Sequence, residues 1–202
     1  SYPSSFGWNA RCVEGGKYYY RDSANGWSFK NAVQGYQSWG TVAYGIRVSA
    51  NSYLYSMVSK LDLCDISDMA NKLHLHDGLG QQLYDPGLLS ANIGGTRYGA
   101  TPLTMASAYA TFASEGKYCE PRPLEKITKS DGSPMKTYES KCEQAISPDI
   151  ANGVSYVLKG VLASGGSAPK RAIGLPDASA AKTGTNDNSS QTWMVGYTRG
   201  LA

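Results

Sequence analysis

Two stretches of the chain combine the apolar spacing of amphipathic helices with residues typical of helix ends. Thr101 and Pro102 precede the first and Gly116 follows it, while Ser147 and Pro148 precede the second. A hydroxyl residue followed by proline favours a helix N-terminus, and glycine favours the position after a helix. We predict buried faces made of Leu103, Ala106, Tyr109, Ala110 and Ala113 in the first helix and of Ile150, Val154, Val157, Leu158 and Val161 in the second.

Shorter elements surround these helices. Residues 41–63 also have helical spacing, but Ser49-Ala50-Asn51 interrupts it, and because Ser and Asn compete with helical backbone bonds we expect a helix end or a helix–helix corner there. A short helix is predicted over 67–73 with Asp65 as its candidate cap, and the glycines of 78–98 predict a loop. Residues 1–38 are predicted to be irregular, with a short strand within 17–21.

Two hairpins complete the pattern. Residues 119–142 are predicted to turn at Ser130-Asp131-Gly132, and residues 182–185 and 192–198 are predicted to form two strands joined by a polar turn. Helices followed by a closing β-hairpin indicate an α/β fold with an α+β-like layout.

Composition narrows the class of protein. The chain has 202 residues, of which 41% are hydrophobic and 17% are charged, so we expect one globular domain. Its net charge is +3 and it has no basic block, so we do not expect it to bind nucleic acid. No apolar stretch approaches the roughly 20 residues that span a bilayer, so a membrane anchor would lie outside this chain. The chain starts without a methionine and stops just after a strand-like run, so we interpret it as a piece truncated at both ends.

The four cysteines have no C-x-x-C spacing, which disfavours a zinc site. Cys119 and Cys142 are equidistant from the predicted hairpin turn, so they should face each other across the two strands and form a disulfide. Cys12 and Cys64 would then pair by elimination. Two disulfides favour an extracytoplasmic location, while four free thiols in a cytosolic protein are the alternative.

The strand at Lys182 carries candidate binding chemistry. Lys182 supplies a cation, Thr183 and Thr185 supply hydroxyls, and Gly184 lets another backbone approach, which together suit a carboxylate-bearing, peptide-like ligand. Taken alone, such a lysine is a solvated charge on an edge strand and a Ser-x-Asn triplet is a helix cap.

Ser49-x-Asn51 and Lys182-Thr183-Gly184, in this order, resemble the second and third motifs of penicillin-binding proteins and serine β-lactamases. TPLTMASAYATFASEGKYCEPRPLEKI and KTGTNDNSSQTWMVGYT resemble the transpeptidase domain of bifunctional, class A penicillin-binding proteins. The resemblance covers nearly the whole chain. It implies a transpeptidase fold, with a helical subdomain and part of an antiparallel sheet, on the outer face of the bacterial cell membrane.

The family's first motif, Ser-x-x-Lys, is not found before Ser49 in this chain. It occurs downstream at Ser114 with Lys117, Ser133 with Lys136 and Ser167 with Lys170. The nucleophile must stand at a helix N-terminus with the lysine one turn later. The first site ends a helix, the second lies in a turn, and Pro169 disfavours a helix at the third. We therefore expect the nucleophile, and the strands around it, in a complementary chain or segment.

The resemblance also implies roles for the residues present. The outside serine would attack the D-Ala-D-Ala carbonyl of a stem peptide, or a β-lactam. Ser49 would relay a proton, Asn51 would hold the substrate amide, and the charge of Lys182 would act on Ser49 and on the substrate carboxylate. Thr183 and Thr185 would bind that carboxylate, the Thr185 N–H would complete an oxyanion hole, and the substrate would lie along the strand at Gly184.

Other functions remain open at this level. None of the six glutamates has Asn four residues later, which disfavours the deacylating loop of a β-lactamase, whereas a DD-carboxypeptidase or a noncatalytic binding module is still possible. His74 and His76 lack an evident third ligand, so no metal or other cofactor is predicted. Trp193, Tyr197 and the tyrosines at 18–20 are interpreted as packing residues.

Overall fold

The fold is given by a computed structural model that describes residues 13–14, 17–18, 31–33, 35–37, 39–86, 88–137, 139–169, 174 and 179–202. Its helices are α1 (Val42–Arg47), α2 (Asn51–Val58), α3 (Leu63–Lys72), α4 (Pro102–Ala113) and α5 (Pro148–Leu162), with short 3-10 helices η2 (Leu89–Ile93) and η3 (Asp187–Ser189). Its strands are β1 (Val13–Glu14), β2 (Lys17–Tyr18), β3 (Lys117–Cys119), β4 (Lys126–Thr128), β5 (Pro134–Thr137), β6 (Cys142–Gln144), β7 (Ala180–Thr185) and β8 (Thr192–Tyr197).

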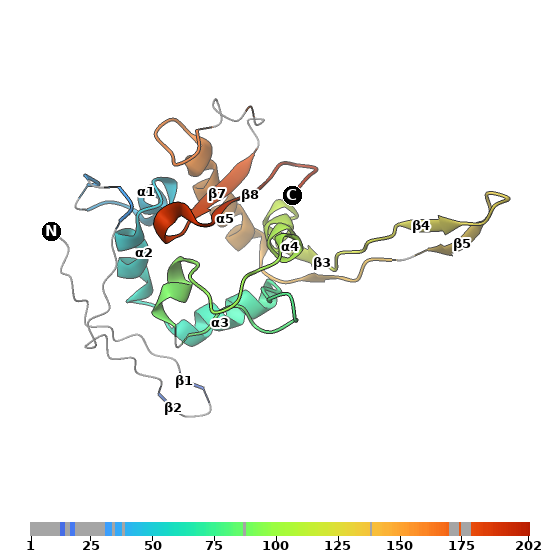
Figure 1. The fold of residues 1–202 in the computed structure, drawn as a ribbon, viewed down its shortest axis with the longest axis horizontal. Coiled ribbons are helices and arrows are strands. Elements are labelled where there is room, and N and C mark those ends of the chain that lie inside the picture. The colour runs from blue at the N-terminus through green and yellow to red at the C-terminus, as the bar shows by residue number, and fades with distance from the viewer. Residues whose placement is uncertain are drawn as a thin grey trace.

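The β7–β8 hairpin lies among the helices, with α4 and α5 packed against it and α1 packed against α5 (Figure 1). A core cluster of Leu158, Ala180 and Tyr197 joins α5 to both strands. The Tyr197 hydroxyl lies 2.6 Å from Ser155 Oγ, which gives the buried phenol a polar partner. The closing hairpin predicted from the sequence is therefore held by α5, which packs against β7, and by α4, which packs against β8.

The ends of α4 and α5 are those predicted. Thr101 Oγ1 accepts a hydrogen bond from Thr104 N at 3.1 Å, and Ser147 Oγ accepts one from Ile150 N at 3.4 Å. The Gly116 N–H donates to Thr111 O at 2.8 Å just beyond α4. Each helix begins where a side-chain acceptor satisfies an otherwise free backbone N–H group.

The buried faces of these helices are only partly those predicted. Leu103 is 63% exposed and Ile150 is 47% exposed, so neither belongs to the core. The residues that α4 and α5 bury are Thr104, Ala108, Thr111, Ala151, Leu158, Val161 and Leu162. Ala113 is exposed as well, so the prediction was wrong for Leu103, Ala113 and Ile150. The buried side of each helix is set by the elements it packs against, which are β3, β8 and α5 for α4 and β7, α1 and α4 for α5.

Two local predictions need correction. The third helix begins at Leu63 rather than near 67, and its cap is Asp62, whose Oδ1 accepts from Cys64 N at 2.8 Å, not Asp65. Asp65 lies inside the first turn, where a carboxylate is favourable without being the cap. The loop over 78–98 contains η2, and Ala91 of that turn is buried with Ala70 and Tyr84.

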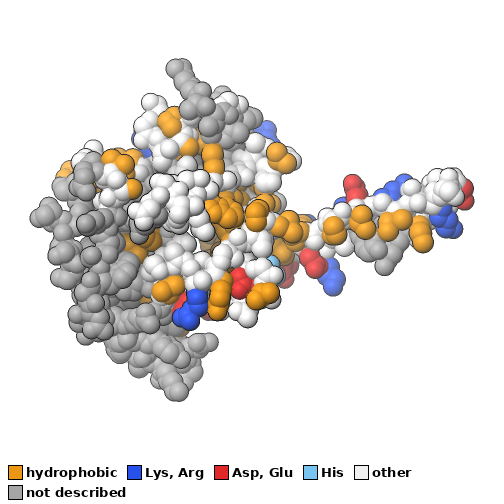
Figure 2. Space-filling model, in the orientation of Figure 1, with side chains coloured by type: hydrophobic (Ala, Val, Ile, Leu, Met, Phe, Trp, Pro, Cys, Tyr) orange, Lys and Arg blue, Asp and Glu red, His pale blue; other side chains and the backbone are white. Residues whose placement is uncertain are grey.

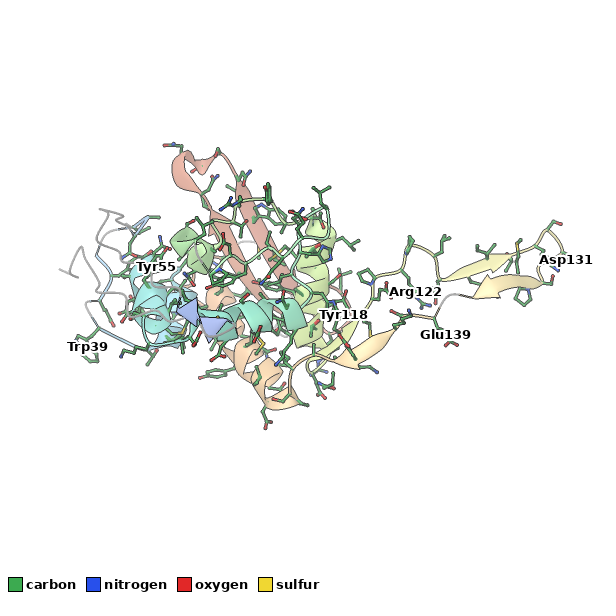
Figure 3. The ribbon with its side chains drawn as sticks, turned by 90° about the horizontal axis from the view of Figure 1, so that it is seen from below. Trp39, Tyr55, Tyr118, Arg122, Asp131 and Glu139 are labelled. Carbon is green, nitrogen blue, oxygen red and sulfur yellow. A yellow bond between two sulfur atoms is a disulfide. The ribbon has the colours of Figure 1, made fainter. Side chains whose placement is uncertain are left out.

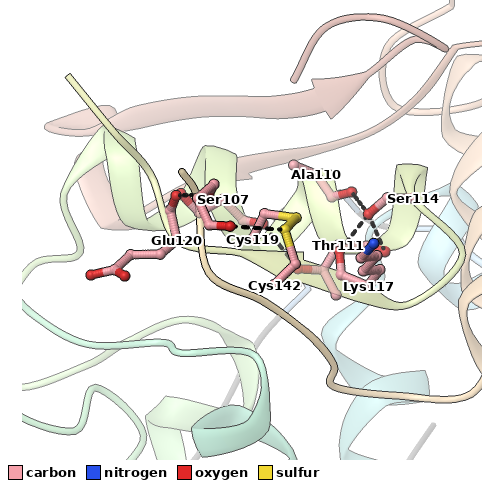
Figure 4. Close-up of a disulfide and its surroundings, with 9 residues drawn as sticks. Ser107, Ala110, Thr111, Ser114, Lys117, Cys119, Glu120 and Cys142 are labelled. Carbon is pink, nitrogen blue, oxygen red and sulfur yellow. Dashed lines mark hydrogen bonds between the residues drawn. A yellow bond between two sulfur atoms is a disulfide. The ribbon is translucent and has the colours of Figure 1, made fainter. Parts of the chain in front are cut away.

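The predicted hairpin forms an arm that projects from the body (Figures 1 and 2). Cys119 and Cys142 are directly opposite in the β3–β6 register and are joined by a disulfide (Figure 4). Farther out, β4 pairs with β5, and Asp131 lies at the tip, where its Oδ1 accepts from Ser133 N (Figure 3). Closing a loop of this size stabilises a chain by about 3 kcal/mol, so the disulfide holds the base of a narrow two-stranded element.

Cys64 is also disulfide-bonded. Cys12 lies outside the described residues, as do the side chains of the 18–20 tyrosine run. In the part of the chain that the structure describes, none of the helices combines the length and apolarity needed to cross a membrane.

Candidate functional site

Ser49 lies in a left-handed turn that ends α1. Its φ is 57°, while the Ser49 N–H bonds Ile46 O at 3.2 Å and the Ala50 N–H bonds Gly45 O at 2.9 Å. This pair of bonds defines a Schellman ending, in which the left-handed position is usually glycine because a Cβ there is strained. The predicted interruption is therefore a helix–helix corner, and it presents the Ser49 side chain from a backbone conformation that serine rarely adopts.

Helix α2 begins directly after this corner, and its N-terminus is capped by a residue that is distant in the sequence. Its N-cap residue, Ala50, has no side-chain acceptor, and Asn51 is the first helical residue. Asn31 supplies the missing bonds: its Oδ1 accepts from Ser52 N at 3.0 Å and its Nδ2 donates to Ser52 Oγ at 3.0 Å. The Ser49–Asn51 triplet therefore does not cap the helix through its own Ser49 side chain, and Asn31 was missed because only the fold brings it here.

Asn31→Ala is expected to lower the free energy of unfolding by about 1 kcal/mol, because it frees an N–H group at the start of α2. For a domain of this size that corresponds to a fall in melting temperature of a few degrees, roughly 2–4 °C. Asn31→Asp is the matched control, since it keeps the acceptor for Ser52 N and should retain most of the stability. Equal melting temperatures for wild type and Asn31→Ala would contradict this account.

Lys182 meets Ser49 across the space between β7 and the α1–α2 corner. Lys182 Nζ donates to Ser49 Oγ at 2.7 Å and to Thr183 O at 2.8 Å. The two residues are 133 positions apart in the chain, so this contact exists only through the packing of α1 on α5 and of α5 on β7. Two members of the predicted site are thus brought within hydrogen-bond distance.

The surroundings of Lys182 change its acidity. Burial of the ammonium group disfavours its charged form and lowers the pKa of Lys182 from 10.5 to about 8. The Ser49 hydroxyl stands directly against this poorly solvated cation. A hydroxyl so placed exchanges protons more readily than one in water, because the nearby positive charge stabilises its deprotonated form.

The rest of β7 continues from this contact toward solvent. Thr183 is half-buried, while Gly184 and Thr185 are exposed, and within the described residues β7 pairs with β8 alone. A Cβ added at Gly184 would meet only Trp193 Cβ, at an ordinary 3.6 Å. Packing inside the chain therefore does not require glycine here, and the strand has a backbone edge open to another extended chain.

A loop after α5 makes three contacts that the sequence pattern did not predict. Ser167 Oγ lies 2.8 Å from Thr183 Oγ1, and Ser167 N donates to Arg47 O at 2.9 Å. The Arg47 guanidinium also donates to Ser164 O. No spacing rule links these residues, because the loop reaches Arg47 and β7 only through the packing of α5 against both α1 and the strand.

The Ser-x-x-Lys serines have backbones that differ from the required helix N-terminus. Ser114 is the residue that ends α4, Ser133 follows the turn of the arm, and Ser167 lies in the loop beside Thr183. A fourth instance joins Ser179, the residue before β7, to Lys182 within that strand. Residues three apart on a strand point to opposite faces, so Lys182 does not serve Ser179 in this way.

The two histidines make local polar contacts. His74 Nε2 lies 2.8 Å from Glu143 Oε1 and its ring stacks on Tyr118, while His76 Nδ1 lies 2.8 Å from Asp77 O. Over the described ranges, no group of three or more His, Cys, Asp or Glu side chains is placed to hold a metal ion.

Comparison with known proteins gives the family. Penicillin-binding protein 1A of Mycolicibacterium smegmatis is 29% identical over 177 residues, which are 80% of this chain and 22% of that protein. The fold is shared with penicillin-binding protein 1A from Haemophilus influenzae (TM-score 0.73, 18% identity, 85% of this chain and 30% of that one). It is also shared with PonA1 of Mycobacterium tuberculosis, solved in complex with penicillin V (TM-score 0.67, 24% identity, 87% and 49%).

The chain thus spans about a fifth of the length of its curated relative. Residues 12–200, nearly all of the chain, match the family described as the penicillin binding protein transpeptidase domain. The fold, the sequence similarity and this match agree, and the chain therefore belongs to the penicillin-binding protein transpeptidase family.

Proposed function

We propose that this chain forms the second- and third-motif side of the active site of a serine DD-transpeptidase that cross-links peptidoglycan. The observation that carries the proposal is the 2.7 Å contact between Lys182 Nζ and Ser49 Oγ, which joins the α1–α2 corner to β7. The reacting serine, in a Ser-x-x-Lys motif, is proposed to lie outside this chain. The enzyme as a whole would work on the outer face of the bacterial membrane, where its substrate is found.

The chemistry proposed is acyl transfer. The outside serine attacks the D-Ala-D-Ala carbonyl, or the ring carbonyl of a β-lactam, so that a C–O bond forms and the C–N bond breaks. Ser49 passes a proton from the lysine of the first motif to the leaving nitrogen. The Lys182 cation stabilises the negative charge that develops on Ser49 Oγ during this transfer, and Asn51 holds the substrate amide.

Substrate docking is proposed along the open edge of β7. The hydroxyls of Thr183 and Thr185 donate hydrogen bonds to the substrate carboxylate, and the ligand backbone lies antiparallel beside Gly184. The 3.6 Å contact at Gly184 supports this role, because the fold itself tolerates a side chain there. PonA1, which has the same fold, was solved with penicillin V, and β-lactam binding is accordingly proposed for this chain.

A complementary segment is proposed to complete the sheet. Among the described residues β7 and β8 form a two-stranded sheet, and Trp193 and Met194 of β8 are 38% and 44% exposed. Two-stranded sheets are marginally stable in water, so further strands that cover these side chains would stabilise the domain. The same segment would carry the Ser-x-x-Lys motif to the site.

Fluorescent penicillin tests where the nucleophile lies. The 202-residue chain alone is expected to remain unlabelled, whereas the protein extended upstream through a Ser-x-x-Lys motif is expected to form a covalent adduct visible by gel and by mass. Labelling of the chain alone would overturn the outside nucleophile, and peptide mapping with Ser167→Ala and Ser179→Ala would then locate the acylated serine. Failure of the extended protein to label would favour a noncatalytic binding module.

The acceptor is tested with a peptide ending in D-Ala-D-Ala. A transpeptidase releases D-Ala and joins the acyl group to an added amine acceptor, and the joined product is expected from the extended protein. Release of D-Ala without the joined product at saturating amine would instead identify a DD-carboxypeptidase.

A further inference from the structure

The loop over 163–168 connects the two walls of the candidate site, which are the α1–α2 corner that carries Ser49 and the strand β7 that carries Lys182. On one wall it is tied to Arg47, two residues before Ser49, through Ser167 N and Ser164 O. On the other wall its Ser167 Oγ lies 2.8 Å from Thr183 Oγ1, one residue after Lys182. The loop therefore forms a second link between walls that the Lys182–Ser49 bond already joins.

The position of Ser167 is set by its surroundings. Arg47 lies along α5, with its Cβ 3.7 Å from the position that a Cβ of Gly160 would take. At Gly165, where φ is +75°, a Cβ would come within 2.9 Å of Arg47 Nη2, so a side chain there would displace the guanidinium. Gly166 N also bonds Ala163 O at 2.9 Å, and Ala168 N bonds Val161 O at 3.1 Å. These backbone bonds hold the loop against the end of α5.

We propose that Ser167 is a positioning residue for the ligand carboxylate, acting through the Thr183 hydroxyl. Each hydroxyl has one hydrogen to donate. If Ser167 donates to Thr183 Oγ1, the Thr183 hydrogen points away from Ser167 and toward the open side of the strand, where a carboxylate accepts it. In the proposed arrangement Ser167 is the donor of the 2.8 Å bond, the Thr183 hydroxyl is left to favour anionic ligands, and the two aligned bonds polarise each other.

The inference rests on the proposed function, and the test separates the two. The full-length protein is acylated with penicillin V and, in parallel, with its methyl ester, and both rates are followed by mass spectrometry. The wild type should prefer the acid. Ser167→Ala should slow acylation by the acid roughly tenfold while changing the ester rate less than about twofold, because only the acid uses the oriented hydroxyl. Ser167→Thr, which keeps a hydroxyl, should restore most of the preference.

Each outcome decides between the two ideas. If the wild type reacts with neither compound, the proposed function fails. If the wild type prefers the acid and Ser167→Ala keeps the same acid-to-ester ratio, Ser167 has no positioning role and the proposed function stands. An equal loss with both compounds, at an unchanged melting temperature, also contradicts the proposal, since it would indicate a general disturbance of the site.

Discussion

Lys182→Ala is expected to slow acylation of the full-length protein by penicillin about a hundredfold to a thousandfold, the range typical of losing one electrostatic contact to a developing charge. The physical reason is the loss of the cation that lies 2.7 Å from Ser49 Oγ. Lys182→Arg is the control variant: it keeps the charge and should retain more activity than alanine. Acylation by Lys182→Ala at the wild-type rate would contradict the role assigned to Lys182.

The pH profile tests the charge itself. Burial lowers the pKa of Lys182 from 10.5 to about 8, so the amine is cationic below pH 8 and neutral above it. Because the proposed role needs the cation, acylation should fall as the pH rises through about 8. In Lys182→Arg the guanidinium stays charged, so this fall should be absent at that pH. A wild-type rate that rises through pH 8 would instead assign Lys182 as a neutral base.

Stability provides a readout of the same pKa that does not depend on activity. Between about pH 8 and pH 10.5 the unfolded chain binds more protons at Lys182 than the folded chain, so the contribution of this residue to stability increases with pH across that window. Below pH 8 both states are protonated and the cost of burying the cation is fully present. The stability of wild type relative to Lys182→Met should therefore improve from pH 8 to pH 10.5.

Ser49→Gly and Ser49→Ala should have similar activities and different stabilities. Both remove the hydroxyl that contacts Lys182, so both should lose about a hundredfold or more in acylation rate. Only glycine relieves the left-handed backbone of Ser49, where φ is 57°. Ser49→Gly is expected to be more stable than Ser49→Ala by about 1 kcal/mol.

Thermal unfolding of the full-length protein measures this difference, which corresponds to roughly 2–4 °C for a domain of this size. Ser49→Ala keeps the strained backbone and so serves as the matched control for the lost hydroxyl. If the alanine variant proved as stable as the glycine variant, the left-handed turn would carry no strain. If either variant kept the wild-type acylation rate, Ser49 would not relay a proton.

The features predicted well are those encoded by neighbouring residues. Thr101-Pro102 and Ser147-Pro148 start helices because each hydroxyl bonds an N–H group only three residues later. The disulfide between Cys119 and Cys142 follows from their equal distance from one turn. The buried faces of the helices were predicted less well, and Leu103 is exposed because a helix's own spacing does not specify which neighbour covers it.

The sequence by itself determined the starts of α4 and α5, the two hairpins, and the two motifs that indicate the family, because each depends on residues close together in the chain. Only the tertiary structure decided that Lys182 reaches Ser49, that Asn31 caps α2, and that Ser167 contacts Thr183. These contacts join residues that are 133, 21 and 16 positions apart, and no local pattern specifies them. The contacts at Lys182 and Ser167 form because α5 packs against both α1 and β7, and that packing is a property of the whole core.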